Sequence, residues 1–221
     1  MGYKPLHLNP LILTVLLLGL MVVLMAIGRK TRIFRFLKKE GSFLFITRLK
    51  SPRRFALIAY HAVVPARGRQ LMIHRICGVT GDLVEIKAGT LFVNGKNVDE
   101  ELRLKHIYKV SQHLAGSLVF KEEEAYTIPP YYDTLYIPLE DSVVKKAQLP
   151  FSRYILPAGL RDEAIFGVYQ QSWNPDHFGP LRVPAGKLFV LGDNRGKAQD
   201  SRYHGLIDRN KVVGSAFCLF T

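Results

Sequence analysis

The chain has 221 residues, 48% of them hydrophobic and 22% charged, so it can bury a core and is not disordered over most of its length. The net charge of +13 is local, because 13 Lys and Arg residues and one acid lie between Arg29 and Arg75. From Ile76 onward, 17 basic residues balance 17 acidic ones. The basic excess therefore lies beside a hydrophobic segment and has no nucleic-acid-reading motif, which argues against a nucleic-acid partner.

The two cysteines, Cys77 and Cys218, are far apart in the sequence and lack metal-ligand spacing. They indicate neither a zinc site nor a disulfide framework. We expect two buried thiols, no bound metal and no cofactor.

An uncharged run of 17 residues from Leu11 to Ile27 predicts a membrane helix. Extended back through Pro10 and Leu8, it approaches the roughly 20 residues that a bilayer requires. The alternative is a cleaved signal peptide, but the apolar run exceeds the usual length of such signals and basic residues follow it at once. We expect residues 1–28 to be a retained N-terminal anchor.

A basic segment, residues 29–40, follows the anchor and alternates basic and apolar residues. This pattern favours a segment at the level of the lipid headgroups, with apolar side chains directed inward. Each Lys or Arg near an anionic surface contributes about 1 kcal/mol. A solvated basic stalk is the alternative.

Strands are predicted to dominate the chain after the basic segment, because β-branched and aromatic residues are concentrated in short runs. Gly81-Asp82 and Asn94-Gly95 are tight-turn pairs between such runs. The expected strands are 43–47, 55–64, 70–78, 83–87, 90–93, 186–191 and 212–220. Residues 99–180 differ in composition, with paired prolines and a tyrosine-rich stretch, and we interpret them as an inserted subdomain with a short helix near 139–149. The core then comprises residues 41–98 and 181–221.

The run from Gly192 to Arg202 carries the strongest motif. Gly-Asp-Asn-Arg is followed, after four residues, by Asp-Ser-Arg, and this spacing resembles the C-terminal motif of type I signal peptidases. In physical terms, a Gly-Asp-Asn turn ends a strand beside the active site, and charge-assisted hydrogen bonds between the Asp and Arg side chains hold it. The motif residues are Gly192, Asp193, Asn194, Arg195, Asp200, Ser201 and Arg202.

Two further segments support this resemblance. The run from His74-Arg75 through Gly81-Asp82 is similar to the family's Lys-Arg segment, which ends in Pro-Gly-Asp before a strand. Residues 54–60 are a weaker match to the family's Arg-Gly-Asp-Ile-Val-Val-Phe. The resemblance implies a mainly β fold, a signal-peptidase-like β-barrel or folded-sheet core with a large inserted subdomain, on one N-terminal transmembrane helix.

The residues at the catalytic positions depart from the family pattern. Bacterial members use a serine nucleophile and a buried neutral lysine as its base. Aligning Gly41-Ser42 with the family's Gly-Asp places Ile33 at the nucleophile position, and an aliphatic side chain cannot attack a carbonyl. His74 stands at the base position, and Ala198 replaces the serine that orients the lysine.

A histidine at the base position does not by itself abolish activity, because the endoplasmic-reticulum type of signal peptidase has one and a neutral imidazole is a competent base. A core histidine satisfied by hydrogen bonds is the alternative. Thr31 or Ser42 are alternative nucleophiles, although the register disfavours both.

Two functions therefore remain. The first is a membrane-docked, catalytically impaired or inactive homologue that holds an extended signal peptide or preprotein by strand addition. The second is an active serine endopeptidase that removes signal peptides, with a relocated nucleophile and with His74, oriented by Asp193, as base. The expected partners are membrane lipids, exported peptides and an active signal peptidase paralogue.

Two arguments about topology conflict. Lys4 is the single basic side chain before the apolar run and six follow within residues 29–39, so the positive-inside rule places the folded domain in the cytoplasm. The family resemblance places it outside. Because the motif match is specific and the charge rule is a statistical bias, we expect a single-pass protein of the plasma (inner) membrane with its C-terminal domain extracytoplasmic.

Overall fold

A computed structural model describes residues 19, 23, 34–39, 42–48, 53–64, 68–115, 125–128, 131–146, 148 and 150–220, with the backbone alone described at 34–39, 42–44, 131–132 and 218–220. The chain forms two compact units. The first comprises Met1–Ser51 and Val213–Thr221, and the second comprises Pro52–Val212.

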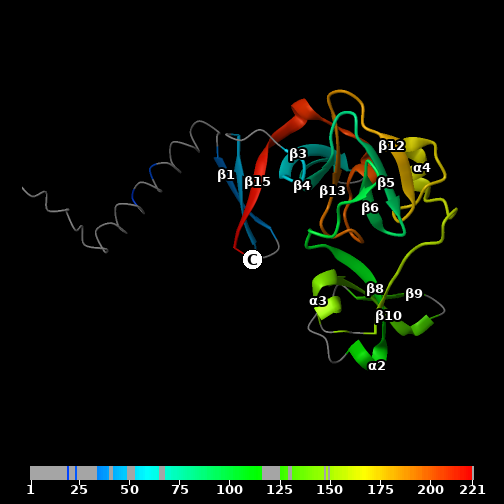
Figure 1. Cartoon of the computed structure of the whole chain (residues 1–221). Helices are drawn as coiled ribbons and strands as arrows, with labels where there is room; N and C mark the ends of the chain where they lie inside the picture. Colours follow the sequence, from blue (N-terminus) through cyan, green and yellow to red (C-terminus); the bar gives the residue numbers. More distant parts are fainter. Residues whose placement is uncertain are drawn as a thin grey trace, which may run out of the picture. The chain divides into compact units, whose positions relative to one another are not determined.

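The first unit contains an antiparallel ladder in the order β1 (Phe34–Lys39), β2 (Ser42–Thr47) and β15 (Val212–Phe220), shown in blue and red in Figure 1. Gly214 lets two of these strands approach closely, because a Cβ at this position would lie 2.6 Å from the Thr47 carbonyl oxygen. The strands expected at 43–47 and 212–220 are confirmed. Residues 34–39, which we had assigned to a membrane-surface segment, are a strand paired with β2.

Of the predicted membrane anchor, the structure describes Gly19 and Val23, both helical and exposed. The remainder of that prediction lies outside the described residues. None of the helices that the structure describes is long and apolar enough to span a bilayer.

The second unit is built on two antiparallel sheets and an inserted third. One has the order β3 (Leu57–Val64), β4 (Gly68–Gly78), β13 (Lys187–Leu191) and β14 (Ile207–Asp208). Another has the order β12 (Phe178–Arg182), β5 (Leu83–Lys87), β6 (Thr90–Val93) and β7 (Lys96–Asn97). Alternating burial along β5 and β6 directs Val84, Ile86, Leu91 and Val93 into the core. The predicted mainly β architecture is confirmed, as is the buried thiol of Cys77, whose pKa burial raises to about 12. The side chain of Cys218 lies outside the description.

The inserted segment has a sheet of its own, in the order β11 (Ser152–Arg153), β8 (Lys105–Ser111), β10 (Tyr131–Glu140) and β9 (Tyr126–Ile128). Two helices, α2 (Gln112–Ala115) and α3 (Asp141–Lys146), accompany it in green in Figure 1. The buried side chains of α2 and α3, Ala115 and Val144, join a core with Tyr108, Val110 and Ile137 of the sheet. The predicted helix near 139–149 corresponds to α3, whereas the sequence did not predict the strands.

Three short helices complete the second unit. Asp162 caps α4 (Glu163–Tyr169) by accepting hydrogen bonds from two backbone N–H groups. The helix α5 (Ser201–His204) begins at the C-terminal motif, and η2 (Arg209–Lys211) precedes β15. A strong cap on so short a helix fixes its direction at its first turn.

Backbone hydrogen bonds attach the inserted sheet to the motif turn. The Lys105 N–H donates to the Asp193 carbonyl oxygen at 2.9 Å, and the Arg195 N–H donates to the Lys105 carbonyl oxygen at 2.8 Å. His106 adds a contact from Nε2 to the Gly89 carbonyl oxygen at 3.3 Å, while its Nδ1 lies 2.9 Å from the Asp141 carboxylate. The first residues of β8 therefore contact both the motif turn and the hairpin of β5 and β6.

Candidate functional site

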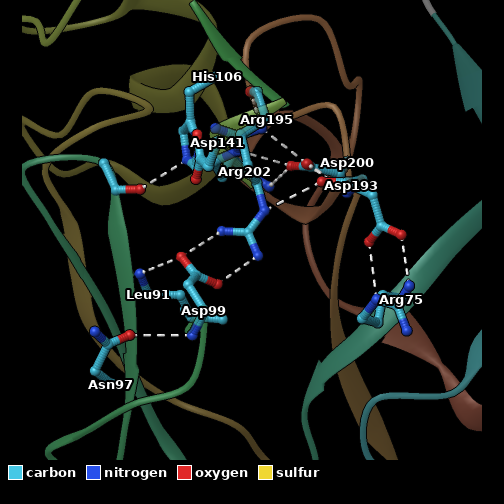
Figure 2. Close-up of polar contacts among 12 residues, drawn as sticks. Arg75, Leu91, Asn97, Asp99, His106, Asp141, Asp193, Arg195, Asp200 and Arg202 are labelled. Carbon is cyan, nitrogen blue, oxygen red and sulfur yellow. Dashed lines mark hydrogen bonds and ion pairs between the residues drawn. The ribbon is translucent and has the colours of Figure 1, made fainter. Parts of the chain in front are cut away.

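Arg75 and Asp193 form the ion pair that connects β4 to the turn after β13 (Figure 2). The Arg75 Nε and Nη2 atoms donate to the two carboxylate oxygens at 2.8 and 2.5 Å, a bidentate geometry. The third contact runs from Arg75 Nη1 to the Phe55 carbonyl oxygen at 2.7 Å. The hydrogen bond from Asp193 raises the pKa of Arg75 despite the opposing effect of its burial. The turn is thus fixed to the strand that carries His74.

His74 is buried beside the motif turn, with 7% of its surface exposed. Its Nδ1 atom lies 2.8 Å from the Tyr60 hydroxyl oxygen. The other edge of the ring faces Gly192: a Cβ at Gly192 would lie 3.4 Å from His74 Cδ2, 3.6 Å from His74 Nε2 and 2.3 Å from Ala198 Cβ. Gly192 therefore has no space for a side chain, and the His74 ring and the Ala198 methyl lie against the same point of the turn.

Asp200 and Arg202 form a fully buried pair, with side chains 0% and 2% exposed. Arg202 donates from Nε and Nη2 to the two Asp200 oxygens, each at 2.9 Å. Asp200 also accepts from the Gly192 N–H at 3.1 Å. Burial raises the pKa of Asp200, but the charge and hydrogen bonds of Arg202, with the charge of the protonated form of His74, outweigh it, so the net shift is downward. Asp200 therefore stays ionised behind the site, with its charge balanced by that of Arg202.

Ser201 and Arg202 join this pair to the surrounding backbone. The Ser201 hydroxyl accepts from the Val190 N–H at 2.9 Å, and Arg202 Nη2 donates to the Arg195 carbonyl oxygen at 2.8 Å. The predicted hydrogen-bonded knot of Asp200, Ser201 and Arg202 is thus present, and it holds both strand β13 and the turn that follows.

A second buried pair joins Arg195 to Asp99, which lies between β7 and β8 (Figure 2). Arg195 donates to the two Asp99 oxygens at 3.0 and 2.7 Å and to the Gly192 carbonyl oxygen at 3.1 Å. Asp99 also accepts from the Leu91 N–H at 2.8 Å. The turn is therefore connected to the start of the inserted segment as well as to β4.

The family comparison agrees with this geometry. The model of the signal peptidase family, peptidase S26, matches residues 11–221. The chain belongs to the signal peptidase family. It is 26% identical over 212 residues to signal peptidase I V of Bacillus subtilis (strain 168), covering 90% of this chain and 92% of that protein.

Two other curated relatives are matched over a smaller share of their length. The chain is 26% identical over 180 residues to signal peptidase I of Bacillus caldolyticus, covering 80% of this chain and 68% of the relative. It is 24% identical over 176 residues to a probable signal peptidase I-2 of Synechocystis sp., covering 78% of this chain and spanning half the length of that protein. A crystal structure of a signal peptidase I from Enterococcus faecalis V583 matches 75% of this chain and 97% of that chain, at 23% identity and a TM-score of 0.36.

The structure brings most of the family motif residues together. The contacts described above connect His74, Arg75, Gly192, Asp193, Arg195, Asp200, Ser201 and Arg202. The side-chain oxygen of Asn194 is buried and has no hydrogen-bond partner within the part of the chain that the structure describes. Neither the residue at the nucleophile position, Ile33, nor the alternative nucleophiles are placed, because residues 31–33 and the side chain of Ser42 lie outside the described residues. No group of three or more His, Cys, Asp or Glu side chains suited to a metal ion occurs within the described part of the chain.

Two contacts were not predicted from the sequence. We had assigned Asp193 to orient His74, but the contact at Nδ1 is with Tyr60 and the Asp193 carboxylate pairs with Arg75. Asp99 was not singled out at all. A tyrosine where the family's Arg-Gly-Asp segment ends in phenylalanine is the signal that could have identified Tyr60, because it is the one residue of that segment that adds a hydroxyl.

Proposed function

We propose that this chain is a membrane-anchored signal peptidase I homologue with impaired catalysis, which holds an extended signal peptide or preprotein without cutting it. The observation that carries the proposal is the environment of His74. Its Nδ1 contacts the Tyr60 hydroxyl and its other edge lies against Gly192, where Ala198 brings a methyl group. His74, at the base position, therefore lies near the methyl group of Ala198, whereas the bacterial enzymes have at that position the serine that orients the base.

The residue at the nucleophile position supports the same proposal. Ile33 has no lone pair, so an acyl-enzyme cannot form through it. In contrast, the ion pairs of Arg75, Arg195 and Arg202 hold the turn together. The fold around the turn is thus retained while the nucleophile is not, and this combination suits a protein that binds a peptide without cutting it.

Strand pairing near the site supports peptide binding by strand addition. The strand β13 pairs with β4 at Arg75, Ile76 and Gly78. Before Arg75, β4 continues for seven further residues, and there β3 is its partner among the described strands. An extended peptide can pair with β4 at Leu71–Ile73, on the side of β4 where β13 pairs farther along. Such a peptide would run directly toward His74.

Purified full-length protein is expected not to cleave a preprotein, and the double variant Ile33→Ser with His74→Lys is expected to remain inactive. Without a hydroxyl at Ala198, the introduced lysine is not oriented, and Phe34 and Phe36 alter the predicted substrate floor. Adding Ala198→Ser should give the highest activity of the series. Cleavage is measured on gels with equal amounts of folded protein.

The unmodified protein and a Ser42→Ala variant provide the matched comparison. Rapid cleavage by the unmodified protein would contradict the proposal. If that cleavage also disappeared in Ser42→Ala, the chain would instead be an active serine endopeptidase with a relocated nucleophile.

For localisation, we propose a single-pass anchor in the plasma (inner) membrane with the folded domain outside, in contact with lipid headgroups and near an active paralogue. Protease added to intact spheroplasts is then expected to digest the domain that follows Arg29. A cytoplasmic protein marker must stay intact in the same sample, and lysed spheroplasts show that the protease can cut the domain. Protection until lysis would exclude the extracytoplasmic placement and, with it, a role with exported peptides.

A further inference from the structure

The Tyr60 hydroxyl is fully buried and lies against His74 across the hairpin of β3 and β4. His74 pairs directly with Ile58, and Tyr60, two residues farther along β3, is on the same face of the sheet. The Tyr60 side chain is 0% exposed, and its hydroxyl oxygen lies 2.8 Å from His74 Nδ1. The ring centroids are 5.8 Å apart at an interplanar angle of 53°, so the two rings are tilted and not stacked.

The direction of this hydrogen bond follows from the hydroxyl. Burial, assisted by the nearby charge of Asp200, raises the pKa of Tyr60 far above its usual value, so the hydroxyl keeps its proton. A buried O–H group without an acceptor costs about 1–3 kcal/mol. Among the groups that the structure describes, His74 Nδ1 is the acceptor in contact with this hydroxyl. Tyr60 therefore donates and Nδ1 accepts.

A neutral imidazole carries one proton, so a ring that accepts at Nδ1 carries its hydrogen on Nε2. We infer that Tyr60 is a positioning residue that fixes His74 in the Nε2–H form, so that Nε2 carries a hydrogen instead of the lone pair of a base. Nε2 is on the ring edge that faces Gly192. Moving the proton to Nδ1 would force the hydroxyl to accept and would remove the acceptor of its own proton.

This inference rests on the proposed function for its meaning: a ring nitrogen that carries a hydrogen cannot take a proton from a nucleophile, which agrees with impaired catalysis. The hydrogen bond from Tyr60 to Nδ1 thus prevents Nε2 from acting as a base. Only the reverse hydrogen bond, with Nδ1–H as donor, would leave Nε2 able to accept a proton.

The test is nitrogen NMR of the full-length protein in detergent micelles, labelled with ¹⁵N-histidine, at a pH where the ring is neutral. His74 is assigned from the signal lost in His74→Asn. The expected result is a protonated Nε2 and an unprotonated, hydrogen-bonded Nδ1. In Tyr60→Phe, the Nδ1 signal should move toward the position of an unbonded ring nitrogen.

Tyr169→Phe is the matched control, because it removes another buried phenol hydroxyl, which donates to the Ser201 carbonyl oxygen, and leaves the contact to His74. The His74 signals should not move in this variant. A proton on Nδ1 in the unmodified protein, or an Nδ1 signal unchanged in Tyr60→Phe, would overturn the inference. Neither result depends on cleavage, so failure of the proposed function in the preprotein assay is distinguishable from failure here.

Discussion

Replacing Arg202 by Ala is expected to lower the free energy of unfolding by about 3–5 kcal/mol, because it leaves a buried carboxylate without its counter-charge. Asp200 is 0% exposed, so water cannot replace the two hydrogen bonds that Arg202 donates. The change also removes a donor from the Arg195 carbonyl oxygen. Chemical denaturation, analysed by linear extrapolation, measures the loss.

Lys211→Ala is the matched control, because Lys211 pairs with Asp208 at 3.0 Å with its side chain 63% exposed. This variant should lose far less stability than Arg202→Ala, since solvent screens an exposed pair. A loss of less than about 1 kcal/mol in Arg202→Ala, the range of surface pairs, would mean that the buried pair does not hold the turn.

Breaking the pair of Arg195 and Asp99 is expected to have a similar cost, about 3–5 kcal/mol for Arg195→Ala, because both side chains are 7% exposed or less. The double variant Arg195→Met with Asp99→Leu removes both charges together. Its loss in free energy of unfolding should be smaller than the sum of the losses in Arg195→Met and Asp99→Leu measured singly, with a coupling energy of roughly 0.5–3 kcal/mol. The measurement is a double-mutant cycle by denaturation.

Hydrogen exchange gives this second prediction a local readout. In Arg195→Ala, the backbone amides at positions 105 and 195 should exchange faster, because their hydrogen bonds join the inserted segment to the turn that the Arg195 side chain stabilises. The Glu85 and Phe92 amides, opposite each other in the hairpin of β5 and β6, report on global unfolding. Equal acceleration of all four amides would show that Arg195 acts on overall stability and not on the turn.

The strands of the core were predictable because their patterns are local. Residues 83–87 and 90–93 alternate in burial between turn residues, and β5 and β6 have the predicted bounds. The strand at Phe34–Lys39 was missed although Phe34 and Phe36 alternate with basic residues. The basic residues next to an apolar run suggested a segment at the membrane surface. That interpretation was preferred over a strand, although the residues alternate with the period of two that a strand shows.

The inserted sheet was missed for a different physical reason. A proline inside a run of residues argues against a strand, and Pro138 lies within β10, opposite Ile107 of β8. On the other side of β10, the pairing with β9 extends no farther than Tyr136. Among the described residues, Pro138 thus lies beyond the part of β10 that is paired on both sides, where a missing N–H removes little. Whether β10 can accommodate Pro138 depends on how far β9 pairs along it, and the sequence around Pro138 does not indicate that length.

The site also has a part that the sequence predicted, which is a contiguous motif, and a part that it did not, which consists of contacts between distant residues. The motif from Gly192 to Arg202 is contiguous, so the sequence predicted its knot. Tyr60 and His74 meet across a hairpin, and Asp99 meets Arg195 from 96 residues away. No spacing rule connects such residues, so these partners required coordinates.

The two backbone hydrogen bonds between Lys105 and the motif turn limit how the length of this protein can vary. Lys105 supplies both a donor and an acceptor to Asp193 and Arg195, as a neighbouring strand would. Deleting the whole inserted segment would leave these backbone groups unsatisfied next to the site. Length changes are therefore tolerated in the outer part of the insertion, around α2 and β9, whereas the few residues at its root belong to the smallest unit of this fold that can keep the turn in place.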